Sequence, residues 1–161
     1  MSFMRKVILL LVLIVILTGC FKDNLKQAKI IDGNWKVTEH RFVFYNYGNP
    51  RQVSLDTTIY NSGTFSFVRI DNQSGTFTFT PVQSNLVILD MNYFARDGKW
   101  EIHHSPTYNT MYLYYGTHDV PDIIIQIADF EKKEQTWYIN KDVGNFTNAY
   151  DITEILKVKK N

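Results

Sequence analysis

Two nearly identical stretches lie twelve residues apart, Ser62-Gly63-Thr64-Phe65-Ser66-Phe67 and Ser74-Gly75-Thr76-Phe77-Thr78-Phe79. In both, phenylalanine alternates with a hydroxyl residue, and this period of two is typical of a strand with one buried face. Asp71-Asn72-Gln73, which stands between them, favours a turn. One strand plus one turn accounts for the offset. We therefore expect two adjacent strands with their phenylalanines on one face.

The same alternation continues along the chain, and no long amphipathic helix pattern interrupts it. Short strands at this spacing predict an all-β domain. We expect an antiparallel up-and-down meander forming a barrel of about eight to ten strands, with a β-sandwich as the alternative. The further candidate strands are Leu86–Met91, Lys99–His104, Thr110–Tyr115, Ile123–Phe130, Thr136–Asn140 and Tyr150–Val158.

Gly33-Asn34-Trp35 stands where the β-rich region begins. It resembles the Gly-x-Trp motif that opens the first strand of lipocalins and related calycin barrels. The resemblance implies that Trp35 closes one end of a barrel whose strands surround a central cavity. It also implies that residues 32–161 are a lipocalin-like domain that binds a small apolar molecule or a lipid.

The N-terminus has the order of features of an export signal. Arg5 and Lys6 precede an apolar run of eleven residues, Val7–Leu17, whereas a membrane-spanning helix needs roughly 20. The run closes with Leu17-Thr18-Gly19-Cys20, which resembles the lipobox of bacterial lipoproteins at all four positions. The resemblance implies that residues 1–19 are a signal peptide and that Cys20 receives diacylglycerol and a further acyl chain such as palmitate. The alternative, a transmembrane anchor with an incidental cysteine, is disfavoured by the short run.

Residues 20–31 are interpreted as the lipidated cysteine and a polar tether. Fully extended, the eleven residues after Cys20 reach roughly 35–40 Å. The opening Cys20-Phe21-Lys22-Asp23-Asn24 partly resembles a signal that sends lipoproteins to the cell surface, and an ordinary linker is the alternative. We expect a lipid-anchored protein of the cell envelope, in the outer membrane, with surface exposure as a further hypothesis.

Composition excludes several classes of protein. Cys20 is the only cysteine, so no disulfide forms within the chain. The part from Cys20 onward has 142 residues, which suits one domain. It holds 15 Lys and Arg against 16 Asp and Glu, a net charge of −1 with histidine neutral. Because nucleic-acid binding needs a basic face, we expect no nucleic-acid partner.

No motif in the sequence points to catalysis or to a metal. His103 and His104 are adjacent on a predicted strand, so their side chains point to opposite faces. Neither a His-x-x-x-His spacing nor a Gly-x-Ser-x-Gly motif occurs. We therefore predict no enzyme, no metal and no cofactor.

Aromatic residues are the one compositional feature that bears on ligands, with 11 Phe and 10 Tyr. Tyr112, Tyr114 and Tyr115 cluster on one predicted strand and are the candidate ligand-binding residues. Two function classes stay open. One is a lipocalin-like module for a small hydrophobic ligand, and the other is a structural lipoprotein that contacts another envelope protein. A void of about 300 Å³ or more in the barrel would favour the first.

The lipobox makes a direct prediction for Cys20. Replacing it (Cys20→Ser) removes the thiol that accepts the lipid, so the uncut precursor is expected to accumulate. The measurement is incorporation of labelled fatty acid, with size on a gel as the readout of processing. Equal labelling of the parent chain and Cys20→Ser would disprove the lipobox assignment.

Overall fold

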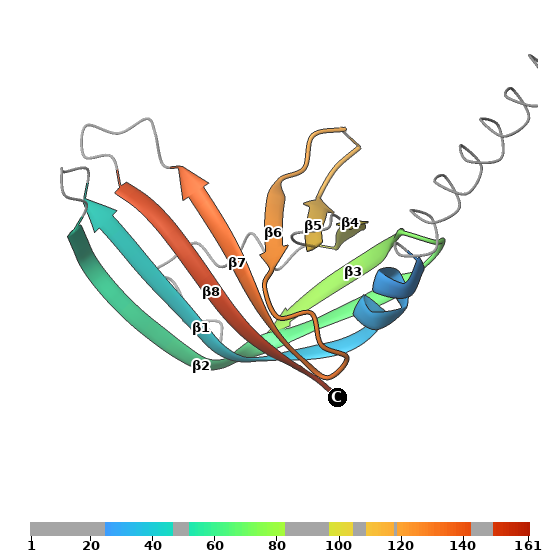
Figure 1. The fold of residues 1–161 in the computed structure, drawn as a ribbon, viewed down its shortest axis with the longest axis horizontal. Helices are drawn as coiled ribbons and strands as arrows, with labels where there is room; N and C mark the ends of the chain where they lie inside the picture. Colours follow the sequence, from blue (N-terminus) through green and yellow to red (C-terminus); the bar gives the residue numbers. More distant parts are fainter. Residues whose placement is uncertain (1–24, 47–51, 83–96, 105–108, 118, 143–149) are drawn as a thin grey trace, which may run out of the picture.

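The computed structural model describes residues 25–46, 52–82, 97–104, 109–117, 119–142 and 150–161. In this part of the chain every strand pairs antiparallel with the next, and the last pairs with the first, so the sheet closes into a barrel (Figure 1). The predicted all-β meander is confirmed, and the β-sandwich alternative is wrong. The predicted strand Leu86–Met91 lies outside the described residues. The strands are β1 (Gly33–Asn46), β2 (Gln52–Arg69), β3 (Ser74–Pro81), β4 (Gly98–His104), β5 (Asn109–Tyr114), β6 (Ile123–Ile127), β7 (Glu134–Asp142) and β8 (Tyr150–Lys160).

The two phenylalanine stretches pair as the alternation predicts. Phe65 lies opposite Phe79 and Phe67 opposite Phe77, with ring centroids 4.5 and 6.0 Å apart. Asp71 makes the turn between them, because its carboxylate accepts hydrogen bonds from the Gln73 and Ser74 backbone amides at 2.9 and 2.7 Å. A third hydrogen bond, from the Ser74 hydroxyl, is the main cause that lowers the pKa of Asp71.

The closed half of the barrel is filled by its own side chains. All three tryptophans are fully buried, and the Trp137 ring contacts those of Trp35, Phe65 and Phe67 at centroid distances of 6.1, 5.6 and 5.9 Å. Tilted and edge-on contacts of this kind add to the free energy of burial. Five aromatic rings of the interior are each at most 4% exposed: Trp35, Phe65, Phe67, Phe77 and Phe79.

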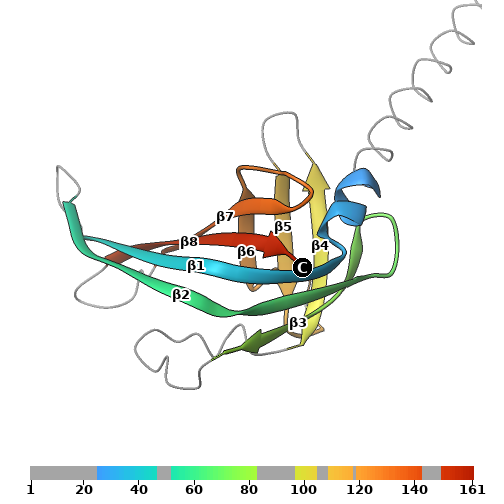
Figure 2. The same ribbon diagram turned by 90° about the horizontal axis from the view of Figure 1, so that it is seen from below.

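A short helix at residues 25–31 corrects the predicted tether (Figures 1 and 2). Ala28 and Ile31 are fully buried and belong to the barrel core, whereas Lys26 and Lys29 are exposed. The reason is local: Ala28 and Ile31 are three residues apart and share one helical face. Lys26 and Lys29 made the segment resemble a linker, but they lie on the outer side of the helix.

Trp35 joins this helix to the first strand. Its indole Nε1 donates a hydrogen bond to the Ile31 carbonyl at 2.6 Å. Gly33 lies between them at φ 113°, a conformation that favours glycine, and a Cβ there would meet Lys160 Cε at 3.0 Å. The two residues of the Gly-x-Trp motif therefore set the turn and the plug at this end of the barrel.

Lys160, near the end of β8, completes the same junction. Its Nζ donates to the Ile30 carbonyl at 2.8 Å and to the Asp32 carbonyl, and lies 5.4 Å from the centroid of Trp35. Burial lowers the pKa of Lys160, and the charge of Asp32 opposes that shift. The last strand is thus bound to the first turn of the fold.

Strand β6 ends earlier than the predicted Ile123–Phe130. It stops at Ile127, and the Ala128 amide then donates to the Thr136 carbonyl at 3.0 Å. The Glu131 amide donates to the Asp129 carbonyl at 3.1 Å. Asp129 therefore lies in a tight connection, where the apolar alternation had suggested a longer strand.

A β-bulge at Thr38 divides β1 into two parts. Val37 pairs with Val158 and Glu39 with Lys157, so Thr38 is an extra residue relative to β8. Relative to β2 the extra residue lies on β2, between Tyr60 and Gly63. Its hydroxyl donates to the Lys157 carbonyl at 3.0 Å. Bulges bend strands and increase their twist, so the sheet changes direction here.

Replacing Trp35 by alanine is expected to cost about 3–5 kcal/mol of the free energy of unfolding, because a buried indole and its hydrogen bond to the helix are lost. Urea unfolding of the mature chain measures this. Lys36→Ala, at an exposed neighbouring position, is the control and should change stability little. A loss below about 1 kcal/mol for Trp35→Ala would contradict the plug.

Candidate functional site

Beyond the bulge, four strands continue past the closed part of the barrel. Among the described residues, β2 pairs with β3 at Gly63–Arg69, with a further backbone hydrogen bond from Val82 to Ser62, and β7 pairs with β6 at residues 137–139. We define the open sheet as residues 39–46 of β1, 52–60 of β2, 140–142 of β7 and 150–157 of β8. Figure 1 shows these strands sweeping beyond β3 to β6.

The register identifies the inner face of the open sheet. Phe42 belongs to the barrel core, so it marks the inner side. Residues two apart share a face, and direct cross-strand partners lie side by side. The inner face consists of three rows across β2, β1 and β8: Ile59, His40 and Leu156; Thr57, Phe42 and Glu154; Leu55, Phe44 and Ile152.

Exposure rises along these rows away from the core. His40, Phe42 and Leu156 are buried, and Phe44 is half-buried against the core. Leu55, at the outer end of the third row, is 51% exposed. An apolar face that is continuous with the core thus becomes accessible to solvent at this end, which is a feature of binding surfaces.

His40 and Glu154 form a polar pair within this apolar face. Nε2 of His40 lies 2.8 Å from Oε2 of Glu154, and the two side chains are 1% and 5% exposed. The His40 ring also stacks on Phe42, at 4.0 Å between centroids. Buried ionisable groups persist only with partners, so the pair holds β1 and β8 in one register. Sequence reasoning missed it, because the two residues are 114 positions apart.

The outer face of the open sheet carries exposed ion pairs instead. Arg41 donates two hydrogen bonds to the Asp56 carboxylate at 2.8 and 2.5 Å, which raises the pKa of Arg41 and lowers that of Asp56. Lys157 lies 2.8 Å from Glu39, and this hydrogen bond raises the pKa of Lys157. The exposed ion pairs of the open sheet therefore lie on its outer face, whereas the buried His40–Glu154 pair lies on its inner face.

The three predicted ligand-binding tyrosines are not brought together. Tyr112 and Tyr114 lie on the outer face, where Tyr114 donates to Glu101 at 3.4 Å. Burial and the charge of Glu101 raise the pKa of Tyr114. Tyr115 instead packs edge-on against Phe77, at 5.6 Å between centroids. Their binding role stays a prediction, and the structure gives it no shared site.

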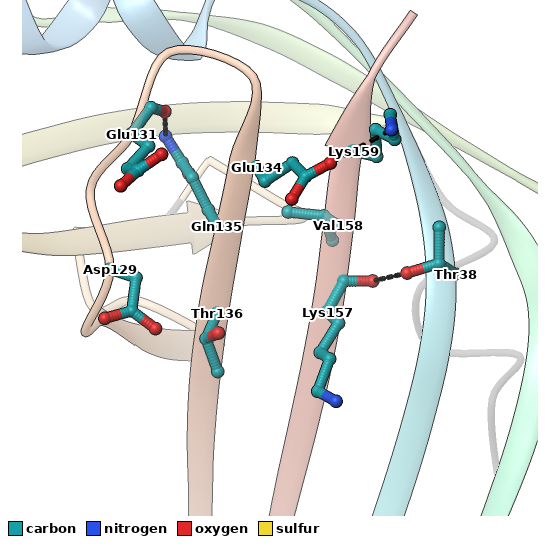
Figure 3. Close-up of a pocket in the computed structure, with 9 residues that line it drawn as sticks. All are labelled: Thr38, Asp129, Glu131, Glu134, Gln135, Thr136, Lys157, Val158 and Lys159. Atoms are coloured by element: carbon teal, nitrogen blue, oxygen red, sulfur yellow. Dashed lines mark hydrogen bonds and ion pairs between the residues drawn. The ribbon is translucent and has the colours of Figure 1, made fainter.

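Two pockets formed by described residues are lined mostly by polar and charged side chains. The smaller, about 250 Å³, includes Tyr114, Glu101 and Lys99. The larger, about 480 Å³, has mixed charges, with Glu134 and Lys159 paired at 3.0 Å (Figure 3). Neither has the apolar lining that a hydrophobic ligand needs. The lining residues of the larger pocket are Thr38, Asp129, Glu131, Glu134, Gln135, Thr136, Lys157, Val158 and Lys159.

Among the described residues, no three His, Cys, Asp or Glu side chains are grouped so as to hold a metal ion. Within the same part of the chain, no helix has the length and apolar character needed to cross a membrane.

Comparison with known families identifies the N-terminal segment. The family model for the prokaryotic membrane lipoprotein lipid attachment site matches residues 4–20, the segment that ends at the lipobox cysteine. This match supports a membrane-anchored lipoprotein of the bacterial envelope, held through lipid on Cys20.

Comparison of the rest of the chain adds no function. No curated protein matches the sequence. Among solved structures, the fold is similar to a redesigned β-barrel, with 9% sequence identity, a TM-score of 0.37, and coverage of 83% of this chain and 94% of that one. The barrel assignment rests on the strand pairing of this chain and not on that similarity.

Truncating one member of the buried pair (His40→Ala) should destabilise the protein by about 3–5 kcal/mol, because Glu154 is left buried without this partner. Replacing both, as His40→Leu with Glu154→Leu, should cost less than the sum of the single changes. Urea unfolding gives all three values, and Arg41→Ala on the exposed outer pair is the control. Simple additivity of the two single changes would refute a coupled pair.

Proposed function

We propose that this envelope lipoprotein binds a small apolar molecule or a lipid acyl chain on the inner face of the open sheet. The observation that carries the proposal is the run of apolar side chains that leaves the core and becomes accessible at Leu55. The lipid on Cys20 would hold this surface close to a membrane, where apolar molecules are concentrated.

The filled half of the barrel supports binding at the open end and not in a central cavity. The rings of Phe65, Phe67 and Trp137 are in mutual contact, so the closed half has no room for the central ligand that a lipocalin-like cavity implies. The inner face of the open sheet has accessible apolar surface, which the closed half lacks, since Phe44, Ile59 and Ile152 are only partly buried.

The chemistry of this face favours an apolar ligand. Burial of accessible apolar surface is favourable by about 25 cal/mol per Å², and Leu55 retains half of its exposure before any ligand binds. The His40–Glu154 pair lies at the inner end of the same face. A ligand with a long apolar part therefore fits better than a compact polar one.

A second candidate, a structural lipoprotein with no internal ligand, is favoured by the same tight core. In that case the barrel is a rigid body, and its outer face or its loops contact another envelope protein. The two candidates differ in whether a free apolar molecule binds at the open end.

Binding is tested with a naphthylamine probe that fluoresces in apolar surroundings, displaced by fatty acids of increasing chain length. We expect saturable binding by the mature chain and better displacement by longer chains. Leu55→Asp should weaken probe binding at least tenfold. Val68→Asp is the matched control, because Val68 lies on the same strand in the closed half and is 57% exposed.

Two results would count against this function. Absence of saturable probe binding would leave the structural candidate as the better account. An equal loss in Leu55→Asp and Val68→Asp would show that the probe reads general surface hydrophobicity and not the open sheet.

A further inference from the structure

The helix at residues 25–31 shortens the tether between the lipid and the barrel. The described helix begins at Leu25, so only residues 21–24 separate it from Cys20. Even fully extended, the chain from Cys20 to Leu25 reaches only roughly 17–18 Å. The 14 residues of β1, which follows the helix, span about 45 Å. The membrane that holds the lipid therefore lies close to the helix, and the far end of β1 is a strand's length from the helix.

Exposed lysines surround this short tether. Lys26 and Lys29 are exposed on the outer side of the helix, and in the described part of the chain neither forms an ion pair. Lys36, also exposed, lies directly opposite Lys159 of β8. Like charges that are directly opposite destabilise a strand pair, so an anionic partner would be favourable here.

The end of the barrel beside the helix is positive, although the mature chain is not. We call this the closed end and define it as residues 25–36, 69–73, 128–134 and 159–161. Hydrogen bonds join these segments, from the Lys160 amide to the Lys133 carbonyl and from the Arg69 amide to the Asp32 carboxylate. Their side chains include eight basic and five acidic groups, whereas the chain from Cys20 onward has a net charge of −1. An anionic surface therefore attracts this end more than the rest of the molecule. The charged residues are Lys26, Lys29, Lys36, Arg69, Lys132, Lys133, Lys159 and Lys160, with Asp32, Asp71, Asp129, Glu131 and Glu134.

The closed end also presents one large apolar side chain to solvent. Ile70, on the turn from β2 to β3, is 70% exposed. Both ribbon views show this turn beside the helix (Figures 1 and 2). Surfaces that lie on membranes combine lysines, which attract anionic headgroups, with apolar side chains that enter the headgroup layer.

We propose that the closed end of the barrel rests on the anionic phospholipids of the membrane that holds the Cys20 lipid, with Lys26, Lys29 and Ile70 in contact with the headgroups. The short tether brings this end to the membrane, and charge orients it there. The open sheet then points away from the headgroups, so its inner face stays accessible. The proposal depends on the lipid anchor and not on the proposed apolar ligand.

Quenching of a fluorophore by spin-labelled lipid headgroups tests which end meets the membrane. The lipid occupies the thiol of Cys20, the only native cysteine, so a single introduced cysteine can be labelled in the lipidated chain. Asn72→Cys puts the label at the closed end, and Gln52→Cys puts it at the far end of the open sheet, both at exposed positions. In vesicles that contain phosphatidylglycerol, we expect roughly threefold stronger quenching at residue 72 than at residue 52.

Charge reversal separates headgroup recognition from tether length. Lys26→Glu with Lys29→Glu should roughly halve the quenching at Asn72→Cys, because the helix then repels the headgroups. Lys99→Glu with Lys157→Glu changes the net charge equally at exposed positions outside the closed end, so it is the matched control and should leave the quenching unchanged. Fatty-acid labelling and circular dichroism check that each variant is lipidated and folded. Added salt should weaken the quenching of the parent chain.

Equal quenching at residues 72 and 52 in the phosphatidylglycerol vesicles overturns the proposal. Stronger quenching at residue 52 also overturns it, because the open end would then lie on the membrane. Undiminished quenching at residue 72 in vesicles of phosphatidylcholine alone would mean that the tether holds the barrel there without anionic lipid, and this result too rejects the proposal. None of these outcomes bears on probe binding at the open sheet, so the two proposals fail separately.

Discussion

The junction around Trp35 is the constraint on which the rest of the barrel depends. The indole is bonded to the Ile31 carbonyl, contacts Trp137 across the interior, and lies beneath the Lys160 ammonium. Helix, first strand, seventh strand and last strand therefore meet at one side chain. A meander closes into a barrel only if its last strand pairs with its first, and the contacts of Trp35 stabilise that pairing. The filled core follows, since closure at this end directs the phenylalanines of β2 and β3 inward.

The bulge at Thr38 marks the point on β1 where the open sheet begins. Below it, Val37 pairs with Gly63 and Val158 within the closed half. Above it, the strands leave the barrel and carry the core pattern outward to the half-exposed Leu55. A sheet face continuous with a core but without a full covering is costly in water, so such a face suits a ligand or a partner. Inserted residues at the same level of β1 and β2 thus separate the filled half of the barrel from the open sheet.

Local alternation in the sequence predicted the strands, because the alternation of side chains along a strand and the residue preferences of turns both depend on neighbouring residues. The pairing of Phe65 with Phe79 follows from a twelve-residue offset. The His40–Glu154 pair does not, because it needs the register of β1 on β8 over 114 positions. The short helix was missed because its two buried residues, Ala28 and Ile31, are too few to show helical periodicity. Tyr112 and Tyr115 were grouped by proximity in sequence, but strand alternation places them on opposite faces.

The inner face of the open sheet is partly exposed beyond the residues where β3 and β6 are paired in the described part of the chain. The exposed ion pairs, Arg41 with Asp56 and Glu39 with Lys157, lie on the outer face. The ion pair of the inner face, His40 with Glu154, is buried. That distribution leaves the accessible part of the inner face, at Leu55, apolar. It is the pattern expected of a surface that is covered when the protein works, and the lipid anchor determines the membrane at which that covering takes place.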